Sequence, residues 1–249
     1  MTHVLILGGT TEASALAAAL AEAGVEATLS YAGRVATPKP QPVAVRVGGF
    51  GGVAGLVAWL RAAKVTHLVD ATHPFAAQMS AHAVAAAMAA GVPHVAFTRP
   101  GWVAEAGDRW TRAADIPAAV AALTGAPRRV MLALGRMHVD AFAAQPQHHY
   151  LLRFVDPPRA AVALPAHDLI VDRGPFTVDG DIALMRVHRS DVLVCKNAGG
   201  LGAQAKLVAA RTLGVPVLMI DRPPVPERIE LRDVAAVLRW LGHAADRGV

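Results

Sequence analysis

Short apolar runs alternate along this chain with longer stretches in which apolar residues recur at helical spacing. A repeated succession of strand and helix is typical of a parallel sheet that helices cover on both faces. The apolar runs predict strands at residues 4–7, 27–30, 43–47, 67–69, 92–97, 129–134, 149–154, 169–171, 192–195 and 217–220. The helical spacing predicts helices at residues 12–22, 53–62, 75–90, 117–123, 137–144, 177–187, 203–213 and 230–241.

Between residues 99 and 108 this pattern gives way to Pro, Gly, Trp and charged residues, and it resumes afterwards. The interruption predicts two domains, residues 1–98 and residues 99–249. Because each half contains several strand–helix units, we expect an α/β fold with two Rossmann-like lobes, mainly parallel sheets and a cleft between the lobes.

The composition excludes several classes of protein. Hydrophobic residues make up 54% of the chain and charged residues 17%, which argues against disorder. No apolar run reaches the roughly 20 residues that a bilayer span requires, and the first residues show no signal-peptide pattern, so we expect a soluble cytoplasmic protein. Cys195 is the only cysteine, which excludes an internal disulfide; we expect it in the core and not as a nucleophile.

The formal net charge is +5, but the basic residues are scattered singly along the chain. Nucleic-acid binding would call for a basic cluster that follows a phosphate backbone, so we expect no nucleic-acid partner. A few loop cations that converge on one site favour an anionic small molecule. The alternative is a basic surface without a specific partner.

The first candidate loop joins the first predicted strand to the first predicted helix. Gly8 and Gly9 permit a tight turn, and the helix start after Thr10 offers backbone N–H groups to a phosphate. Thr10 or Thr11 would cap the helix or donate to a phosphate oxygen. The spacing is not G-x-G-x-x-G, so a capped Gly-rich turn without a ligand remains the alternative.

The second candidate loop follows the strand at residues 27–30. Sheets that prefer NAD usually place a carboxylate here, whereas the 2′-phosphate of NADPH calls for cationic and hydroxyl donors. Ser30 and Arg34 supply such donors and no carboxylate competes with them. The loop therefore favours NADPH over NADH, although by itself it is also compatible with a surface loop.

The third candidate loop has the sequence Asp-Ala-Thr-His-Pro-Phe-Ala at residues 70–76. Pro74 suits a first helical turn, for which Thr72 or His73 would be the cap. Asp70 at a strand end is expected to fix the loop backbone. His73 is a candidate for donating to a substrate carboxylate or transferring a proton, and a structural hydrogen bond is the alternative.

The fourth candidate loop follows the strand at residues 192–195. Lys196 and Asn197 place a cation and an amide beside Gly199 and Gly200. Because glycines permit close backbone approach, this combination suits an anionic or carboxamide-bearing ligand that bridges the two halves. A flexible turn with a solvated lysine is the alternative.

Together these four segments resemble the precorrin-6A reductase family of cobalamin biosynthesis. The 70–76 segment is the most specific part of a resemblance that runs from the first strand to the last helix. One departure is Ala198, where the family commonly has serine, so a hydroxyl group cannot be essential there.

The resemblance implies a two-lobed enzyme that uses NADPH to reduce one double bond of the anionic tetrapyrrole precorrin-6A, giving precorrin-6B or its cobalt analogue. The first domain would bind NADPH and the second would close the substrate cleft. We expect cofactor binding by Gly8, Gly9, Thr10, Thr11, Glu12, Ser30, Tyr31, Arg34, Asp70, Ala71 and Thr72. We expect substrate binding by His73, Phe75, Arg99, Arg136, Lys196, Asn197, Gly199 and Gly200.

Further cations near predicted loops are Arg153, Arg173 and Arg222, and we expect about half of all the loop cations to face the cleft. Hydride transfer is the chemistry of the cofactor, while orientation and electrostatics come from the protein. His73 and Lys196 are the candidate proton donors, with solvent or the substrate itself as alternatives.

Other functions find less support in the sequence. The chain lacks a G-x-S-x-G nucleophile elbow and an H-E-x-x-H metal motif, and we expect no metal. A methyltransferase would normally carry an acidic residue where Ser30 and Tyr31 stand. A non-catalytic NADPH-binding sensor is the main alternative, and it predicts nucleotide binding without affinity for a tetrapyrrole. The sequence leaves open the oligomeric state and the choice between metal-free and cobalt-containing substrate.

Overall fold

The computed structural model describes residues 1–33, 40–158 and 160–245. The chain forms two compact units, one of residues 1–99 with 224–249 and one of residues 100–223. The boundary between residues 99 and 100 lies one residue from the predicted boundary between residues 98 and 99. The assignment of the whole segment 99–249 to the second domain was wrong, because residues 224–249 return to the first unit.

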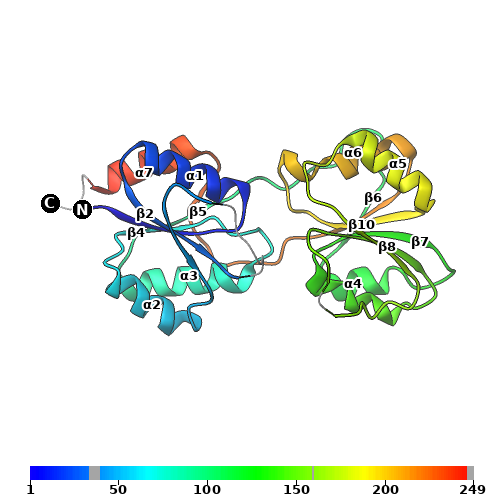
Figure 1. The fold of residues 1–249 in the computed structure, drawn as a ribbon, viewed down its shortest axis with the longest axis horizontal. Helices are drawn as coiled ribbons and strands as arrows, with labels where there is room; N and C mark the ends of the chain where they lie inside the picture. Colours follow the sequence, from blue (N-terminus) through cyan, green and yellow to red (C-terminus); the bar gives the residue numbers. More distant parts are fainter. Residues whose placement is uncertain (34–39, 159, 246–249) are drawn as a thin grey trace. The chain divides into compact units, whose positions relative to one another are not determined.

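The first unit is a parallel six-stranded sheet with helices on both faces (Figure 1). Its strands are β1 (His3–Leu7), β2 (Glu26–Tyr31), β3 (Ala44–Val47), β4 (His67–Asp70), β5 (His94–Phe97) and β12 (Glu230–Leu231). Its helices are α1 (Thr11–Glu22), α2 (Gly52–Ala62), α3 (Ala77–Ala90) and α7 (Val234–Ala245). Helices α1 and α7 cover one face, and α2 and α3 cover the other.

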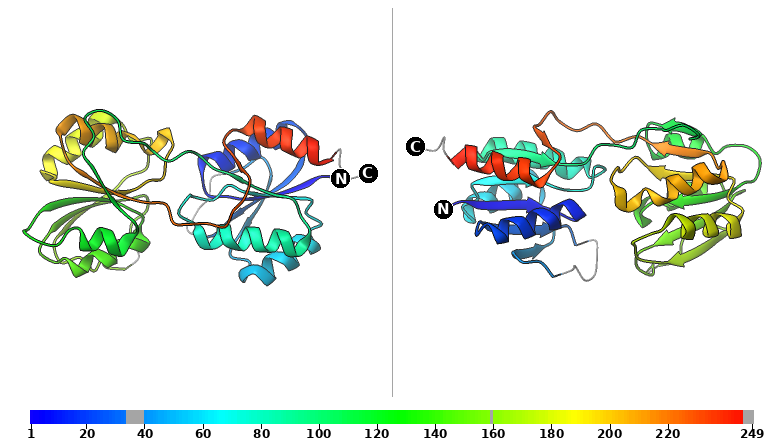
Figure 2. Two further views of the ribbon diagram at one scale, coloured as in Figure 1. Left: turned by 180° about the vertical axis from the view of Figure 1, so that it is seen from behind. Right: turned by 90° about the horizontal axis from the view of Figure 1, so that it is seen from above.

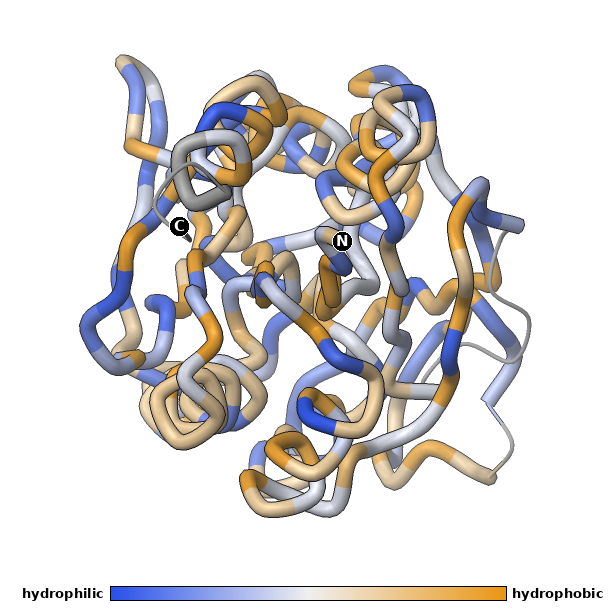
Figure 3. The backbone as a smooth tube through the Cα atoms, turned by 90° about the vertical axis from the view of Figure 1, so that its left-hand side faces the viewer, coloured by the Kyte–Doolittle hydropathy of each residue, from blue (hydrophilic) through white to orange (hydrophobic). Residues whose placement is uncertain are grey.

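Strand β1 shows why this sheet needs helices on both faces. Val4 and Ile6 are fully buried against α1 and α7, whereas Leu5 and Leu7 are buried against α2 and α3. Successive side chains of a strand point to opposite faces, so an uninterrupted apolar run is the pattern of a strand that is covered twice. The helices, in contrast, carry hydrophobic and hydrophilic positions within the same turns (Figure 3).

The strand order of the first sheet is β12-β5-β4-β1-β2-β3. From β1 the chain adds β2 and β3 on one side, and it then adds β4, β5 and β12 on the other side, so the strand order reverses between β1 and β4. These two strands pair directly, with Leu7 opposite Asp70. In doubly wound sheets ligands bind outside the carboxyl ends of the strands at such a reversal. The two loops that leave this edge are those that follow Leu7 and Asp70.

The second unit repeats this architecture. Its strands are β6 (Trp110–Ala113), β7 (Arg129–Ala133), β8 (His149–Phe154), β9 (His167–Val171), β10 (Val192–Lys196) and β11 (Val217–Ile220). They form a parallel sheet in the order β6-β11-β10-β7-β8-β9. Helices α5 (Val178–His188) and α6 (Ala205–Leu213) cover one face and α4 (Ile116–Ala121) lies on the other. Its reversal point lies between β7 and β10, which also pair directly.

The predicted α/β architecture with parallel sheets is confirmed. Cys195 is also where we expected it, since it is fully buried beside Met219 and burial raises the pKa of its thiol to about 11. A thiol with this pKa stays protonated at neutral pH and is a poor nucleophile. Among the described residues, no helix combines the length and the apolar character that crossing a membrane requires.

Several predicted elements differ from those observed. The predicted helix at residues 137–144 is a pair of short 3₁₀ segments, Arg136–His138 and Asp140–Ala144. The predicted helix at residues 230–241 begins only at Val234, because Glu230 and Leu231 pair with β5 as strand β12. Figure 2 shows the returning segment and places α7 beside α1. Strand β6 was not predicted, since its four residues, Trp-Thr-Arg-Ala, do not form an apolar run.

The return of the C-terminal segment predicts a specific loss of stability. Arg228 Nη1 lies 2.7 Å from the Asp70 carboxylate, and both side chains are nearly inaccessible to solvent. We expect Arg228→Gln to lower the free energy of unfolding by about 3–5 kcal/mol, because it leaves a buried carboxylate without its cation. Urea denaturation followed by circular dichroism measures the loss. The exposed Arg232→Gln on the same segment is the control, and equal stability of the two variants would contradict the assignment.

Candidate functional site

The loop between β1 and α1 contains two glycines that are required for different reasons. A Cβ at Gly8 would lie 2.4 Å from Leu29 Cδ1, so Gly8 is fixed by packing against β2. Gly9 has φ of +121°, which favours glycine, and a Cβ there would meet no atom of the described part of the chain within 4 Å. Among these residues, the space beside Gly9 is therefore open at the amino end of α1, where backbone N–H groups and the helix dipole attract an anion.

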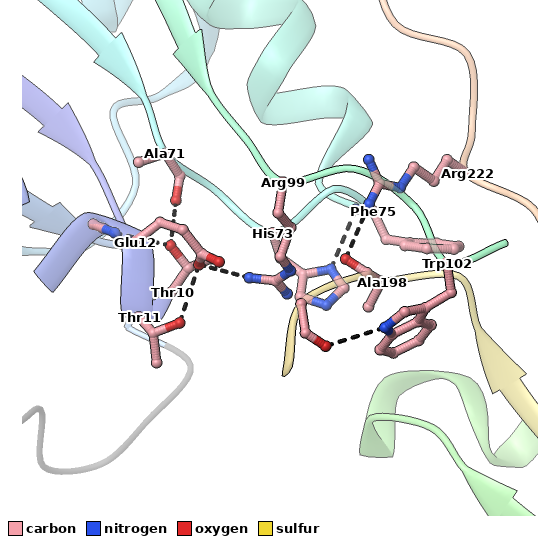
Figure 4. Close-up of polar contacts among 12 residues, drawn as sticks. Thr10, Thr11, Glu12, Ala71, His73, Phe75, Arg99, Trp102, Ala198 and Arg222 are labelled. Carbon is pink, nitrogen blue, oxygen red and sulfur yellow. Dashed lines mark hydrogen bonds and ion pairs between the residues drawn. The ribbon is translucent and has the colours of Figure 1, made fainter. Parts of the chain in front are cut away.

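Thr10 holds this loop in place and links it to the neighbouring strand end. Its Oγ1 accepts a hydrogen bond from Ala13 N at 3.1 Å, which makes Thr10 the N-cap of α1. The same hydroxyl donates to Ala71 O at 2.8 Å, across the reversal point of the sheet (Figure 4). The sequence left open whether Thr10 caps the helix or donates to a phosphate, and the observed geometry is that of a cap.

Glu12 and Arg99 form an ion pair in the first turn of α1. Arg99 Nη1 lies 2.6 Å from Glu12 Oε2, which also accepts a hydrogen bond from Thr11 (Figure 4). Partial burial raises the pKa of the Glu12 carboxyl, but the hydrogen bond and charge of Arg99 outweigh this and leave the pKa below its usual value. Glu12 is therefore a carboxylate, and Arg99 offsets its charge at the helix end where an anion would bind.

A cation on β3, Arg46, lies beside the end of β2 and was not among the predicted site residues. Arg46 lies opposite Ser30 in the register of β3 on β2, and its Nη1 donates to Ser30 Oγ at 2.7 Å. The guanidinium also donates to the carbonyls of Gly48 and Gly49 and lies 3.8 Å above the ring of Phe50. Partial burial lowers the pKa of Arg46. Arg34, which we predicted for this role, lies outside the described residues.

The loop after β4 depends on the buried carboxylate of Asp70. Its Oδ1 accepts hydrogen bonds from the backbone and hydroxyl of Thr72, and its Oδ2 accepts from Ser80 Oγ and Arg228. Asp70 is only 2% exposed. Asp70 therefore fixes the backbone of this loop, as we expected, and Thr72 takes part in the same hydrogen bonds. Cofactor contacts of Asp70, Ala71 and Thr72 stay predictions.

His73 is exposed at the tip of the same loop. Its Nδ1 accepts a hydrogen bond from Phe75 N at 3.2 Å, which puts the proton of a neutral imidazole on Nε2. Its carbonyl accepts from Ala76 N, and this turn delays the start of α3 to Ala77. The predicted start of that helix near Phe75, with Thr72 or His73 as its cap, was therefore wrong.

In the second unit, the loop after β10 is bound to the segment that enters the unit. The side-chain amide of Asn197 accepts from Trp102 N at 2.6 Å and donates to Trp102 O at 3.0 Å. Trp102 Nε1 donates in turn to Gly200 O at 3.1 Å (Figure 4). Asn197 is 6% exposed. These contacts give Asn197 a structural role, and its predicted substrate contact stays untested.

Gly199 is required by close packing within the protein. It has φ of +70°, and a Cβ there would lie 2.0 Å from Pro100 O and 2.8 Å from Arg222 Nη2. Arg222 donates to the carbonyl of Asn197 at 2.9 Å. It also donates to the carbonyl of Ala198 at 3.0 Å (Figure 4). We predicted that this glycine admits a ligand, but the group that approaches its backbone belongs to the protein.

Two predicted cations follow paired strands at the reversal point of the second sheet. Arg136 lies three residues after Ala133, the last residue of β7, and is exposed, whereas Lys196 is the half-buried last residue of β10. Arg153 forms a buried ion pair with Asp181 beneath α5 and lies 3.7 Å above the ring of Phe176. Arg173 pairs with Asp156 on the surface. Arg153 and Arg173 therefore each have a carboxylate partner within the second unit.

Arg46, Trp102 and Arg228 were absent from the predicted site. Arg46 lies on the predicted strand at residues 43–47, which follows the strand of Ser30 in the sequence. Its position opposite Ser30 depends on the register of β3 on β2, which the sequence does not give. Trp102 and Arg228 carry no such signal, because each contacts residues that lie 95 or more positions away.

Comparisons with known proteins agree over the whole chain. The family model described as "Precorrin-6x reductase CbiJ/CobK" matches residues 3–242. A protein named precorrin-6A reductase from Rhodobacter capsulatus is 57% identical over 251 residues and the match covers both chains completely. A protein of the same name from Rhodococcus erythropolis is 51% identical, covering 99% of this chain and 100% of its own. A solved structure described as CobK precorrin-6A reductase has a TM-score of 0.94 at 56% identity, and the match covers both chains completely.

The packing of Gly199 predicts a sharp contrast between two glycines of one loop. We expect Gly199→Ala to destabilise the protein by about 2 kcal/mol or more, because the methyl group meets a carbonyl and the backbone adopts a left-handed conformation. Gly202→Ala is the matched control, since its Cβ would meet nothing within 4 Å. Thermal unfolding of both variants measures the contrast. Equal melting temperatures would contradict the proposed packing.

Proposed function

The chain belongs to the precorrin-6x reductase family CbiJ/CobK, whose reaction is the reduction of precorrin-6A in cobalamin biosynthesis, and we propose that this chain carries out that reaction with NADPH. It is an oxidoreductase, and a reduced nicotinamide supplies the hydride. Membership of a reductase family favours this function over a non-catalytic NADPH sensor. The observation that carries the choice of NADPH is the contact between Arg46 and Ser30.

The end of β2 is where doubly wound sheets meet the ribose of a dinucleotide. A carboxylate there favours NADH, because it hydrogen-bonds the ribose hydroxyls and repels a 2′-phosphate. Residues 31–50 contain neither Asp nor Glu, and Arg46 is held at this strand end by Ser30 and two carbonyls. Its charge and the Ser30 hydroxyl suit a phosphate dianion, which is the group that distinguishes NADPH from NADH.

The pyrophosphate of the cofactor would lie at the amino end of α1. Open space beside Gly9 permits close approach to the backbone, and the N-cap Thr10 keeps the first turn of the helix in place. Arg99 offsets the negative charge of Glu12, which would otherwise repel the cofactor from this turn. The first unit therefore offers two anion sites, and both lie at the carboxyl edge of its sheet.

The substrate is a macrocycle that bears acetate and propionate carboxylates. Arg136 and Lys196 extend from the ends of paired strands β7 and β10, and we assign them to these carboxylates. The exposed His73 lies on the loop after β4, and we assign it to donate a hydrogen bond or a proton to the acceptor. Catalysis then consists mainly of orientation, which can contribute on the order of 7–11 kcal/mol.

The NADPH assignment is tested by Arg46→Ala. We expect KM for NADPH to rise by about tenfold or more while the parameters for NADH stay unchanged, because only NADPH carries the 2′-phosphate. Initial rates of precorrin-6A reduction with both nucleotides measure this ratio, and Arg46→Lys should restore part of it. Arg61→Ala, on the surface of α2, is the control. Equal losses with both nucleotides would indicate a structural role for Arg46.

The substrate assignments are tested by His73→Ala and by Arg136→Ala and Lys196→Ala. We expect His73→Ala to lower kcat by about 10²-fold or more at saturating substrate, as for the loss of a general acid. The two cation variants should instead raise KM for precorrin-6A, and the increase should shrink at high salt. Steady-state kinetics separate these effects. Near-normal kcat for His73→Ala would exclude it as the proton donor.

A further inference from the structure

Two histidines and an aspartate meet on the second unit, away from the strand ends described above. The cluster consists of His149, the first residue of β8, Asp168 on β9 and His188 at the end of α5. One ligand atom from each residue lies within 4.8 Å of the others. Because these residues lie near the amino ends of parallel strands, the cluster is at the opposite edge of the sheet from Lys196.

The three side chains share one face of the sheet. His149 and Leu151 have the same parity on β8, as do Asp168 and Ile170 on β9, and Leu151 and Ile170 pack in the cluster beneath α5 and α6. His149 Nε2 already lies 2.9 Å from Asp168 Oδ2. The rings of His149 and His188 are 5.5 Å apart between their centroids.

The environment of the His188 ring indicates that this cluster binds a ligand. His188 is 3% exposed, and its buried Nε2 has no hydrogen-bond partner among the residues that the structure describes. A buried polar atom without a partner costs on the order of 1–3 kcal/mol, so an unsatisfied nitrogen requires an explanation. Its Nδ1 lies 3.1 Å from Ser190 Oγ, a contact of the kind that orients the ring of a metal-binding histidine.

We propose that His149, Asp168 and His188 bind a zinc ion that joins helix α5 to the edge strand β9 and its neighbour β8. Two imidazoles and a carboxylate are a set of donors that Zn²⁺ prefers, with water as the fourth ligand. Tetrahedral zinc with bonds of about 2.0–2.2 Å keeps its ligand atoms about 3.4 Å apart. Reaching this spacing requires only small side-chain rotations, since two of the ligands are exposed: His149 by 35% and Asp168 by 55%.

The charges around the cluster are compatible with a divalent cation. The carboxylates of Asp168 and Asp191 and the guanidinium of Arg129 are the charged groups that act on His188 from neighbouring segments. Arg129 is the nearest opposing cation, but its Nη2 lies 3.8 Å from Asp168 in an exposed contact that a metal can replace at little cost.

The experiment is a titration of the metal-free full chain with ZnCl₂ by calorimetry, repeated with CoCl₂ by visible absorption. We expect one ion per chain, intense d–d bands from tetrahedral Co²⁺, and a higher melting temperature with Zn²⁺ present. Asp168→Asn and His149→Gln should each weaken binding by at least about tenfold. Both positions are at least partly exposed, so these variants are expected to fold even where His188→Gln does not.

Two further variants separate a designed site from surface binding. Ser190→Ala should weaken zinc binding by about 10–100-fold, because the ring of His188 loses the contact that orients it. His167→Gln is the matched control, since it removes the adjacent histidine on the opposite face of β9 and should leave binding unchanged. The proposal is overturned if the wild-type chain does not bind zinc, or if affinity is unchanged in Asp168→Asn and His149→Gln.

Discussion

The buried carboxylate of Asp70 is the contact on which the first unit depends. It accepts hydrogen bonds from Thr72 in the loop after β4, from Ser80 on helix α3, and from Arg228 on the returning C-terminal segment. A buried charge is tolerated only where hydrogen bonds and an opposite charge replace its water, and Asp70 has both. Asp70, the last residue of β4, therefore also holds the edge strand β12 in the sheet, since its partner Arg228 lies just before β12, which pairs with β5.

This arrangement sets the conformation of both loops at the reversal point. Thr10 caps α1 and donates to Ala71, the residue that follows Asp70, so the loops after β1 and β4 are joined directly. Because internal hydrogen bonds already hold this edge of the sheet, the cofactor binding that we propose there would cost little conformational entropy. In the second unit Trp102 and Arg222 hold the loop after β10 in a comparable way, although different residues make the contacts.

Residues of one type serve different purposes in these loops. Gly9 faces open space and is required by its backbone conformation, whereas Gly199 is required because Pro100 and Arg222 approach it. The arginines also differ: Arg153 and Arg228 form ion pairs with the buried carboxylates of Asp181 and Asp70, whereas Arg136 is exposed after β7. Residue type alone therefore does not distinguish a glycine or an arginine that packs within the protein from one that lies at the surface.

The sequence by itself determined the α/β architecture, most strands, the position of the first boundary and the loops that leave the binding edges. Apolar runs and helical spacing are local properties, so they can be read without knowledge of the fold. Only the tertiary structure decided that residues 224–249 rejoin the first unit, that Arg46 reaches Ser30, and that His149, Asp168 and His188 meet. Each of these depends on strand register or on contacts between residues far apart in the chain. Strand β12 has only two residues, so it shows no periodicity from which it could be predicted. The energy of such contacts comes from burial and charge pairing, which exist only once the chain has folded.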